Sequence, residues 1–266
     1  MDSATRQAPG DAGLYGPGSA TWAIHGHPVA WIGGVRALYL QALHPAALRG
    51  VFGASDYRAD PWGRLIRTAE FVGVTTFGSA PQARAAAERI RLMHARLEVD
   101  DPHLLRWVHC CEVESFLDVA LRSGGPRVDA DAYLAEQAAN AWLVGLDPKD
   151  VPADRAALGE YFDRMRPELA AGQEARQVAR FLLVPPMPNQ VRLLTPALPA
   201  WVVLSAVAFD TLPGWARRLY RVPRPPGADL SVGLLLRTLR GAVDLLPEQV
   251  RQGPHQRAAV ARLAGQ

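Results

Sequence analysis

One histidine in this sequence stands where a helix would present apolar side chains. In "SAPQARAAAERIRLMHARLEV", His94 lies between Ala83, Ala87 and Ile90 on one side and Leu97 on the other, at the i, i+4, i+7 spacing of a single helix face. Such an imidazole is either a core residue that hydrogen-bonds to its neighbours or a metal ligand. The core interpretation is the more frequent case, so the segment alone leaves the ligand interpretation open.

Three polar residues of the preceding helix share one face. In "RLIRTAEF", Arg64, Arg67 and Thr68 are spaced i, i+3 and i+4. If that face points inward, the two guanidinium groups need an anion, because a buried unpaired charge is costly and arginine matches carboxylates well. A cofactor with carboxylates and an iron atom would satisfy this face and His94 together. The alternative is that both arginines reach solvent and pair with Asp60 or Glu70.

Other histidines give weaker signals. His109, in "LLRWVHCCEVESF", is predicted to be a second buried histidine, and Glu112 lies three residues on, where an i, i+3 contact could orient the ring. His25 and His27, in "HGHP", have the spacing of metal ligands but no partnering carboxylate nearby, so we interpret them as structural. His44 is expected to bond the last carbonyls of its helix.

Composition excludes several function classes. The chain of 266 residues is 49% apolar and 21% charged, with a net charge of +3 and no run of like charges, which argues against nucleic-acid binding. Its two cysteines, Cys110 and Cys111, are adjacent and predict neither a disulfide nor a zinc site. The first residues lack a signal-peptide pattern, so we expect a cytoplasmic protein. Nucleotide-binding, hydrolase and zinc-protease motifs are missing from the sequence.

Helical periodicity dominates the chain and predicts an all-α, multi-helix bundle. Residues 30–44 are apolar nearly all round, which is typical of a central helix. A second helix is expected from Pro61 to Val72, ended by Gly73. Ser79 is the predicted N-cap of a third helix, and Asp100 or Asp101 that of a fourth, which ends at Gly124.

The predicted organisation is a single helical domain over residues 21–250. It has a core at 24–188 and proline-punctuated helices at 189–250, with a flexible lead-in at 1–20 and a tail at 251–266. The most apolar stretch, "PAWVVLSAVAF", is too short to span a membrane and is expected to be a buried core helix. Peripheral membrane contact is the alternative, because the basic and aromatic "GWARRLYR" follows it.

Four segments follow one another along the chain: "GGVRALYLQALHPAALRGV", "DPWGRLIRTAEFVGVTTFG", "IRLMHARL" and "DDPHLLRWVHCCEVESFL". In sequence and spacing they resemble the MpaB/rubber-oxygenase catalytic domain family, which includes latex-clearing rubber oxygenases. The resemblance runs from about Ile24 to Pro188, well over half the chain. Several independent motifs in the same order are more specific than any one of them.

The resemblance implies a globin-reminiscent helical fold that encloses a pocket for haem b. By position, His94 matches the histidine that ligates the iron, and Arg64 and Thr68 match the polar pair on the opposite side of the haem. His109 matches the histidine of the family's "WVH" motif and is expected at the cofactor, without an assigned role.

One position and one segment depart from the family pattern. Arg67 stands where latex-clearing enzymes carry a lysine that can occupy the sixth iron position. Arginine stays protonated and has no free lone pair, so we expect an open or water-bound sixth position with Arg67 as a hydrogen-bond donor. The segment between His94 and "WVH" is also shorter than in many bacterial relatives.

These expectations together describe a haem-dependent oxidoreductase, an oxygenase or desaturase. Its partners would be O2 and a small hydrophobic or terpenoid-like substrate, with Arg64, Arg67 and Thr68 as catalytic residues. Two other functions stay open at this point. One is a haem-binding sensor or carrier without turnover, and the other is a helical interaction module without a cofactor.

Overall fold

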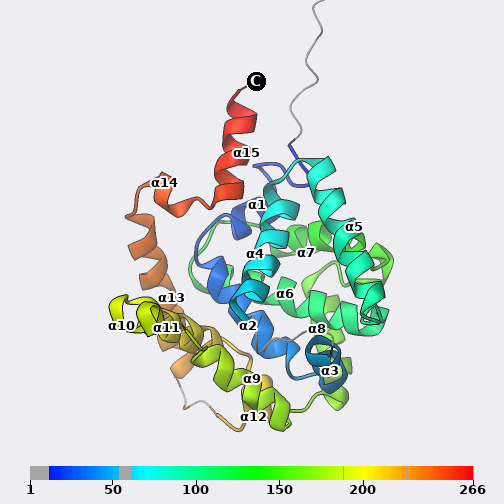
Figure 1. Ribbon diagram of the computed structural model, residues 1–266, viewed down its shortest axis with the longest axis vertical. Coiled ribbons are helices and arrows are strands. Elements are labelled where there is room, and N and C mark those ends of the chain that lie inside the picture. Colours follow the sequence, from blue (N-terminus) through cyan, green and yellow to red (C-terminus); the bar gives the residue numbers. More distant parts are fainter. Residues whose placement is uncertain (1–11, 54–60, 188, 224, 226, 266) are drawn as a thin grey trace, which may run out of the picture.

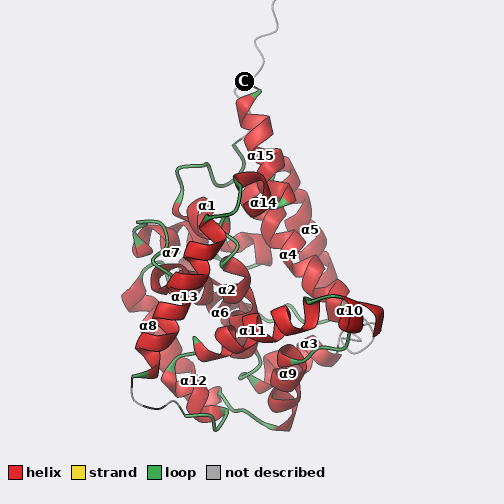
Figure 2. Cartoon of the chain, turned by 90° about the vertical axis from the view of Figure 1, so that its left-hand side faces the viewer, coloured by secondary structure: helices red, strands yellow, loops and turns green. Residues whose placement is uncertain are grey.

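The chain folds into a helical bundle. The computed structural model describes residues 12–53, 61–187, 189–223, 225 and 227–265. Every regular element within these ranges is a helix (Figure 2). The predicted all-α class is therefore confirmed.

The helices follow one another through short connections (Figure 1). In chain order they are α1 (Ala20–His25), α2 (Ala30–Gln41), α3 (Pro45–Gly53), α4 (Pro61–Phe77), α5 (Ala80–Arg96), α6 (Pro102–Arg122), α7 (Ala130–Ala139), η1 (Ala141–Val144), η2 (Pro148–Asp150), α8 (Arg155–Met165), η3 (Arg166–Glu168), α9 (Gln173–Leu183), α10 (Asn189–Leu194), α11 (Ala197–Asp210), α12 (Gly214–Leu219), α13 (Ala228–Asp244), α14 (Glu248–Arg251) and α15 (Pro254–Ala264).

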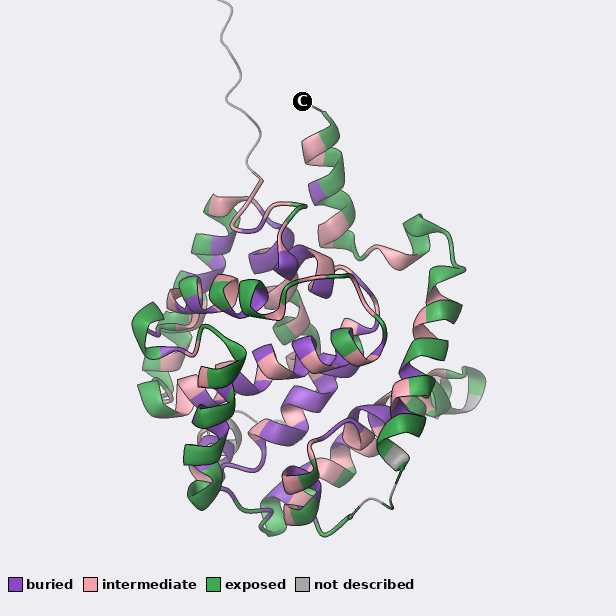
Figure 3. Cartoon of the chain, turned by 180° about the vertical axis from the view of Figure 1, so that it is seen from behind, coloured by how far each residue is buried: buried purple, intermediate pink, exposed green. Residues whose placement is uncertain are grey.

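The centre of the bundle is the pair α2 and α6. Most of the buried surface follows these helices and their neighbours (Figure 3). Gly33 lets α2 approach α6 closely, since a Cβ atom there would lie 3.0 Å from the Phe116 ring and 3.1 Å from the Ser115 carbonyl oxygen. The central position predicted for this nearly apolar helix is confirmed, although the helix ends at Gln41 and its Arg36 is buried with the apolar residues.

A buried guanidinium joins the two central helices. Arg36 of α2 is only 1% exposed. Its guanidinium bonds both carboxylate oxygens of Glu114 and donates to Ser115 Oγ at 2.7 Å. Its Nε donates to the Thr211 carbonyl at 3.3 Å and lies 3.6 Å from the Asp118 carboxylate. The charge is thus compensated within the core, as a buried cation requires.

Helices α4 and α5 form an antiparallel hairpin. The turn between them contains Gly78 and Ser79, and Ser79 caps α5 as predicted. The Ser79 hydroxyl accepts from the Gln82 N–H, while the Gln82 side chain accepts from the Ser79 N–H at 2.9 Å. This capping box fixes where α5 begins. Because α5 runs antiparallel to α4, it also fixes which part of α4 lies beside His94.

Helix α4 does not end at Gly73, so the boundary predicted there is wrong. The helix continues to Phe77. A Cβ atom at Gly73 would lie 2.5 Å from the His255 ring of α15, which packs across α4. The glycine therefore makes room for a neighbouring helix, which local sequence does not reveal. At the next boundary Asp101, not Asp100, caps α6, accepting from the His103 N–H at 2.8 Å.

The apolar segment after Pro196 forms the helix α11, and the expectation of a buried core helix holds only in part, since Val203 is 55% exposed. Its Ser205, Val207 and Ala208 are buried. Arg217 of the following α12 is also buried and pairs with Asp210 at 2.6 Å, so it does not form part of a basic surface. No helix in the described ranges is long and apolar enough to cross a membrane.

The structure predicts that Arg36 is essential for stability. Arg36→Met leaves Glu114 and Asp118 without their cation, and it should lower the free energy of unfolding by about 3 kcal/mol, because breaking a buried ion pair strands its partner charge. The exposed pair Arg164–Glu160 on α8 is the control. Arg164→Met should cost under about 1 kcal/mol in the same urea titration. Equal losses of unfolding free energy in the two variants would show that burial does not increase the contribution of the Arg36 ion pair.

Candidate functional site

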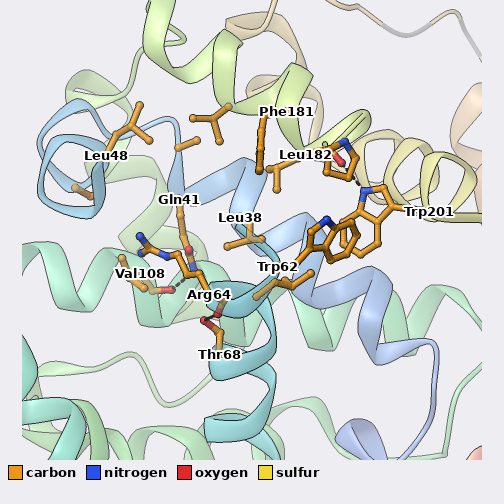
Figure 4. Close-up of a pocket in the computed structure, with 15 residues that line it drawn as sticks. Leu38, Gln41, Leu48, Trp62, Arg64, Thr68, Val108, Phe181, Leu182 and Trp201 are labelled. Carbon is orange, nitrogen blue, oxygen red and sulfur yellow. Dashed lines mark hydrogen bonds between the residues drawn. The ribbon is translucent and has the colours of Figure 1, made fainter. Parts of the chain in front are cut away.

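A pocket lies beside the first turns of α4 and is bounded by α2, α3, α6, α9 and α11 (Figure 4). It contains about 900 Å³ of empty space, including space open to solvent. Arg64 and Thr68, two of the predicted site residues, line it. The rest of the lining is mainly apolar, and includes Leu38, Leu65, Val108, Phe181, Leu182 and Pro185.

The polar residues of α4 are not all equivalent. Arg64 is half-buried, whereas Arg67 is exposed and does not line the pocket. Burial lowers the pKa of Arg64, and the like charge of Arg67 lowers it further. The Thr68 hydroxyl donates to the Arg64 carbonyl at 3.1 Å, which leaves its oxygen as an acceptor. Of the three residues predicted to share a face, the pocket therefore combines two.

His94 lies in the last turn of α5 and is half-buried. Its Nδ1 atom is buried and has no hydrogen-bond partner in the described part of the chain. Burial lowers the pKa of His94, the Asp100 charge raises it, and the Arg64 charge lowers it. The charge of Arg64 therefore acts on the His94 ring across the α4–α5 hairpin. His94 itself is not part of the pocket lining.

The apolar stripe predicted around His94 holds only in part. Ala83 and Ala87 are fully buried, but Leu97 is 39% exposed. The apolar face of α5 is therefore buried at the start of the helix and becomes more exposed toward its end, where His94 lies. His94 thus occupies the margin of the core, a place at which a side chain can reach a bound molecule.

Two titratable groups of α6 are strongly shifted. Burial lowers the pKa of His109 to about 4 and raises that of Glu112 to about 7. His109 Nε2 has no hydrogen-bond partner within the described residues, so Glu112 does not bond it there. Both side chains keep some accessible surface. Burial is therefore the main cause of both pKa shifts.

The two histidines of "HGHP" are held by hydrogen bonds, as the structural interpretation predicts. His25 bonds Thr76 Oγ1 at 3.0 Å and the Tyr133 hydroxyl at 2.9 Å, and burial lowers its pKa to about 3. His27 bonds Asp244 of α13 at 3.0 Å, and its Nδ1 accepts from the Val29 N–H. Both rings connect distant helices.

One cluster escaped the sequence analysis. Glu168 Oε2 lies 3.3 Å from His44 Nε2 and 2.8 Å from His103 Nε2. The expectation that His44 bonds carbonyls of its own helix was wrong, because its Nδ1 accepts from the Ala47 N–H of α3. The ring proton is therefore on Nε2, where a metal would need a lone pair. These three residues are close enough to hold a metal, and Glu168 is the common hydrogen-bond partner of both rings. They come from three distant segments, so no local signal predicts them.

The shifted pKa of Glu112 predicts a pH-dependent stability difference. The folded chain retains a proton between about pH 4.5 and 7 that the unfolded chain releases, so stability falls as the pH rises through that range. Glu112→Gln removes this penalty. It should match the wild type near pH 5 and exceed it by about 3 kcal/mol at pH 8, as measured by denaturant unfolding. Glu88→Gln, at an exposed position of α5, is the control. A difference that does not change with pH would contradict the prediction.

Comparison with known proteins identifies the family. The family described as "ER-bound oxygenase mpaB/B'/Rubber oxygenase, catalytic domain" matches residues 22–253. No curated protein and no solved structure matches the chain. The matched range is longer than the resemblance over 24–188, and it contains the pocket, His94, His109 and all three polar residues of α4. The chain therefore belongs to the MpaB/rubber-oxygenase catalytic domain family, which is a family of oxygenases.

Proposed function

We propose that this protein is a haem b-dependent oxygenase or desaturase that acts on a small hydrophobic or terpenoid-like substrate with O2. His94, which lies at the margin of the core and outside the lining of the apolar pocket, would hold the iron of a haem enclosed by the globin-reminiscent bundle. The single observation that carries the proposal is the buried Nδ1 atom of His94, which has no protein partner among the described residues, close to the cationic Arg64. The family membership supports the reaction class.

The residues present fit an iron porphyrin. Burial favours the neutral form of His94, the form that has a lone pair for a metal. A guanidinium at Arg64 suits the carboxylates of the cofactor or a negative charge that develops on oxygen. His109 brings a second ring nitrogen without a protein partner in the described ranges, beside a partly accessible Glu112.

Bound haem would supply the iron that activates oxygen. The protein's own contribution is electrostatic and steric. Arg64 donates hydrogen bonds toward negative charge at the polar end of the pocket, and Thr68 lies one turn along α4 beside it. Arg67 is exposed, so its positive charge acts on the site through Arg64. The apolar walls exclude water and accommodate a hydrophobic substrate.

Haem binding through His94 has a direct test. Protein purified with a supply of haem should show a Soret band, and His94→Ala should lose most of it while its far-UV circular dichroism stays unchanged. His103→Ala, which removes a half-exposed histidine at the start of α6, should keep the band.

A wild type without a Soret band would rule out haem binding. A band that persists in His94→Ala would rule out His94 as the ligand. Haem-loaded protein that consumes oxygen with none of a series of hydrophobic substrates would indicate a carrier.

The arginine at position 67 allows a prediction about the sixth ligand of the iron in the resting, haem-loaded protein. Arginine cannot ligate iron, so the wild-type spectrum should lack the features of a strong nitrogenous sixth ligand. Arg67→Lys should also lack these features, because position 67 is exposed and lies outside the pocket lining. Arg67→Gln is the matched control and should resemble the wild type. A nitrogenous sixth ligand already present in the wild type would contradict the prediction.

A further inference from the structure

Two indole rings form one end of the pocket. Trp62 lies in the first turn of α4 and Trp201 in the first half of α11, yet their ring centroids are 4.8 Å apart at an angle of 75°. Figure 4 shows both rings on one side of Leu38. Edge-to-face contact of this kind stabilises the position of both rings. We call Trp62 and Trp201 the tryptophan pair.

The polar atoms of the tryptophan pair are already engaged. Trp62 Nε1 donates to the Pro186 carbonyl at 2.8 Å, and Trp201 Nε1 donates to the Leu182 carbonyl at 2.7 Å. Ser205 Oγ also donates to the Leu182 carbonyl, at 2.8 Å. The end of α9 is thereby tied to α4 and α11. What the rings offer the pocket is carbon surface with a π face, not a hydrogen-bond donor.

The opposite end of the pocket is polar. Arg64 and Thr68 line it there, together with Gln41, whose Nε2 donates to the Val108 carbonyl at 3.2 Å. In Figure 4, Arg64 and Gln41 lie on the other side of Leu38 from the two indoles. The pocket thus has a polar end, an apolar middle and an aromatic end.

We propose that the tryptophan pair determines substrate length and specificity. The ligand is an elongated apolar molecule whose reacting end lies at Arg64 and Thr68 and whose far end, with double bonds or a ring, contacts Trp62 and Trp201. The assignment of the reacting end rests on the proposed function, whereas binding at the aromatic end does not. Both rings line the pocket, and π faces favour an unsaturated group over a saturated one.

Ligand binding can be tested without knowing the natural substrate. The neutral fluorophore N-phenyl-1-naphthylamine is bound to haem-supplied protein and displaced with farnesol, or with the saturated linear alcohol of the same chain length. The wild type should prefer farnesol. Trp62→Phe and Trp201→Phe should each weaken farnesol binding about 3- to 10-fold, as expected for the loss of an aromatic contact, and reduce that preference. Trp31→Phe, at an exposed ring outside the pocket, should bind as the wild type does.

A second kind of variant tests the pocket in case a tryptophan variant fails to fold. Leu38→Phe fills the middle of the pocket and leaves the tryptophan pair and its anchors in place, so it should weaken both alcohols about equally. Unchanged farnesol binding in both tryptophan variants, or in Leu38→Phe, would overturn the proposal.

The Soret band of the same samples separates this proposal from the proposed function. Displacement that depends on the tryptophan pair in protein that takes up no haem would overturn the haem proposal and support the binding site. Normal haem uptake without any dependence on the tryptophan pair would overturn the binding site alone.

Discussion

The buried charge of Arg36 constrains the whole bundle. A guanidinium that is 1% exposed must find its anions inside the protein, and Arg36 finds them on α6, at Glu114 and Asp118. Only one rotation and one height of α2 against α6 bring these groups together. Because Gly33 lets the two backbones approach, the ion pair and the close packing specify the same arrangement. Apolar contact alone, which is not directional, would tolerate several.

This arrangement of α2 against α6 positions the residues that the two helices contribute to the pocket. With α2 held in this register, Gln41 accepts from Trp107 Nε1 through its carbonyl and donates from its side chain to the Val108 carbonyl. Tyr39 bonds Ser205 of α11 at 2.8 Å. Helix α11 is thus aligned with α2, and Trp201, one turn before Ser205, faces the pocket. The aromatic end of the pocket therefore depends indirectly on the central ion pair.

Features that depend on local sequence were predictable, and features that depend on distant segments were not. Ser79 caps α5 because a serine followed by glutamine three residues later satisfies the first backbone N–H groups by itself. Gly73 was misjudged because its role is to admit His255 from the far end of the chain. The site divides in the same way. Helical spacing put Arg64 and Thr68 on one face, but only the packing of α9 and α11 shows which part of that face is covered, and Arg67 lies outside it.

The electrostatics of the site follow from burial. Burial lowers the pKa of His25 to about 3 and that of His109 to about 4, so both rings are neutral at pH 7, and the pKa of His94 is shifted in the same direction. Glu112, with a pKa raised to about 7, is close to half protonated there. Arg64 stays cationic under all these conditions, because its unperturbed pKa lies far above them. A neutral imidazole beside a permanent cation suits a metal on one side and an anion on the other. Since desolvation causes these shifts, water that entered through a loosened bundle would return the pKa values toward their usual range. The Glu112 carboxyl would then be ionised at pH 7, whereas the imidazoles would stay mostly neutral.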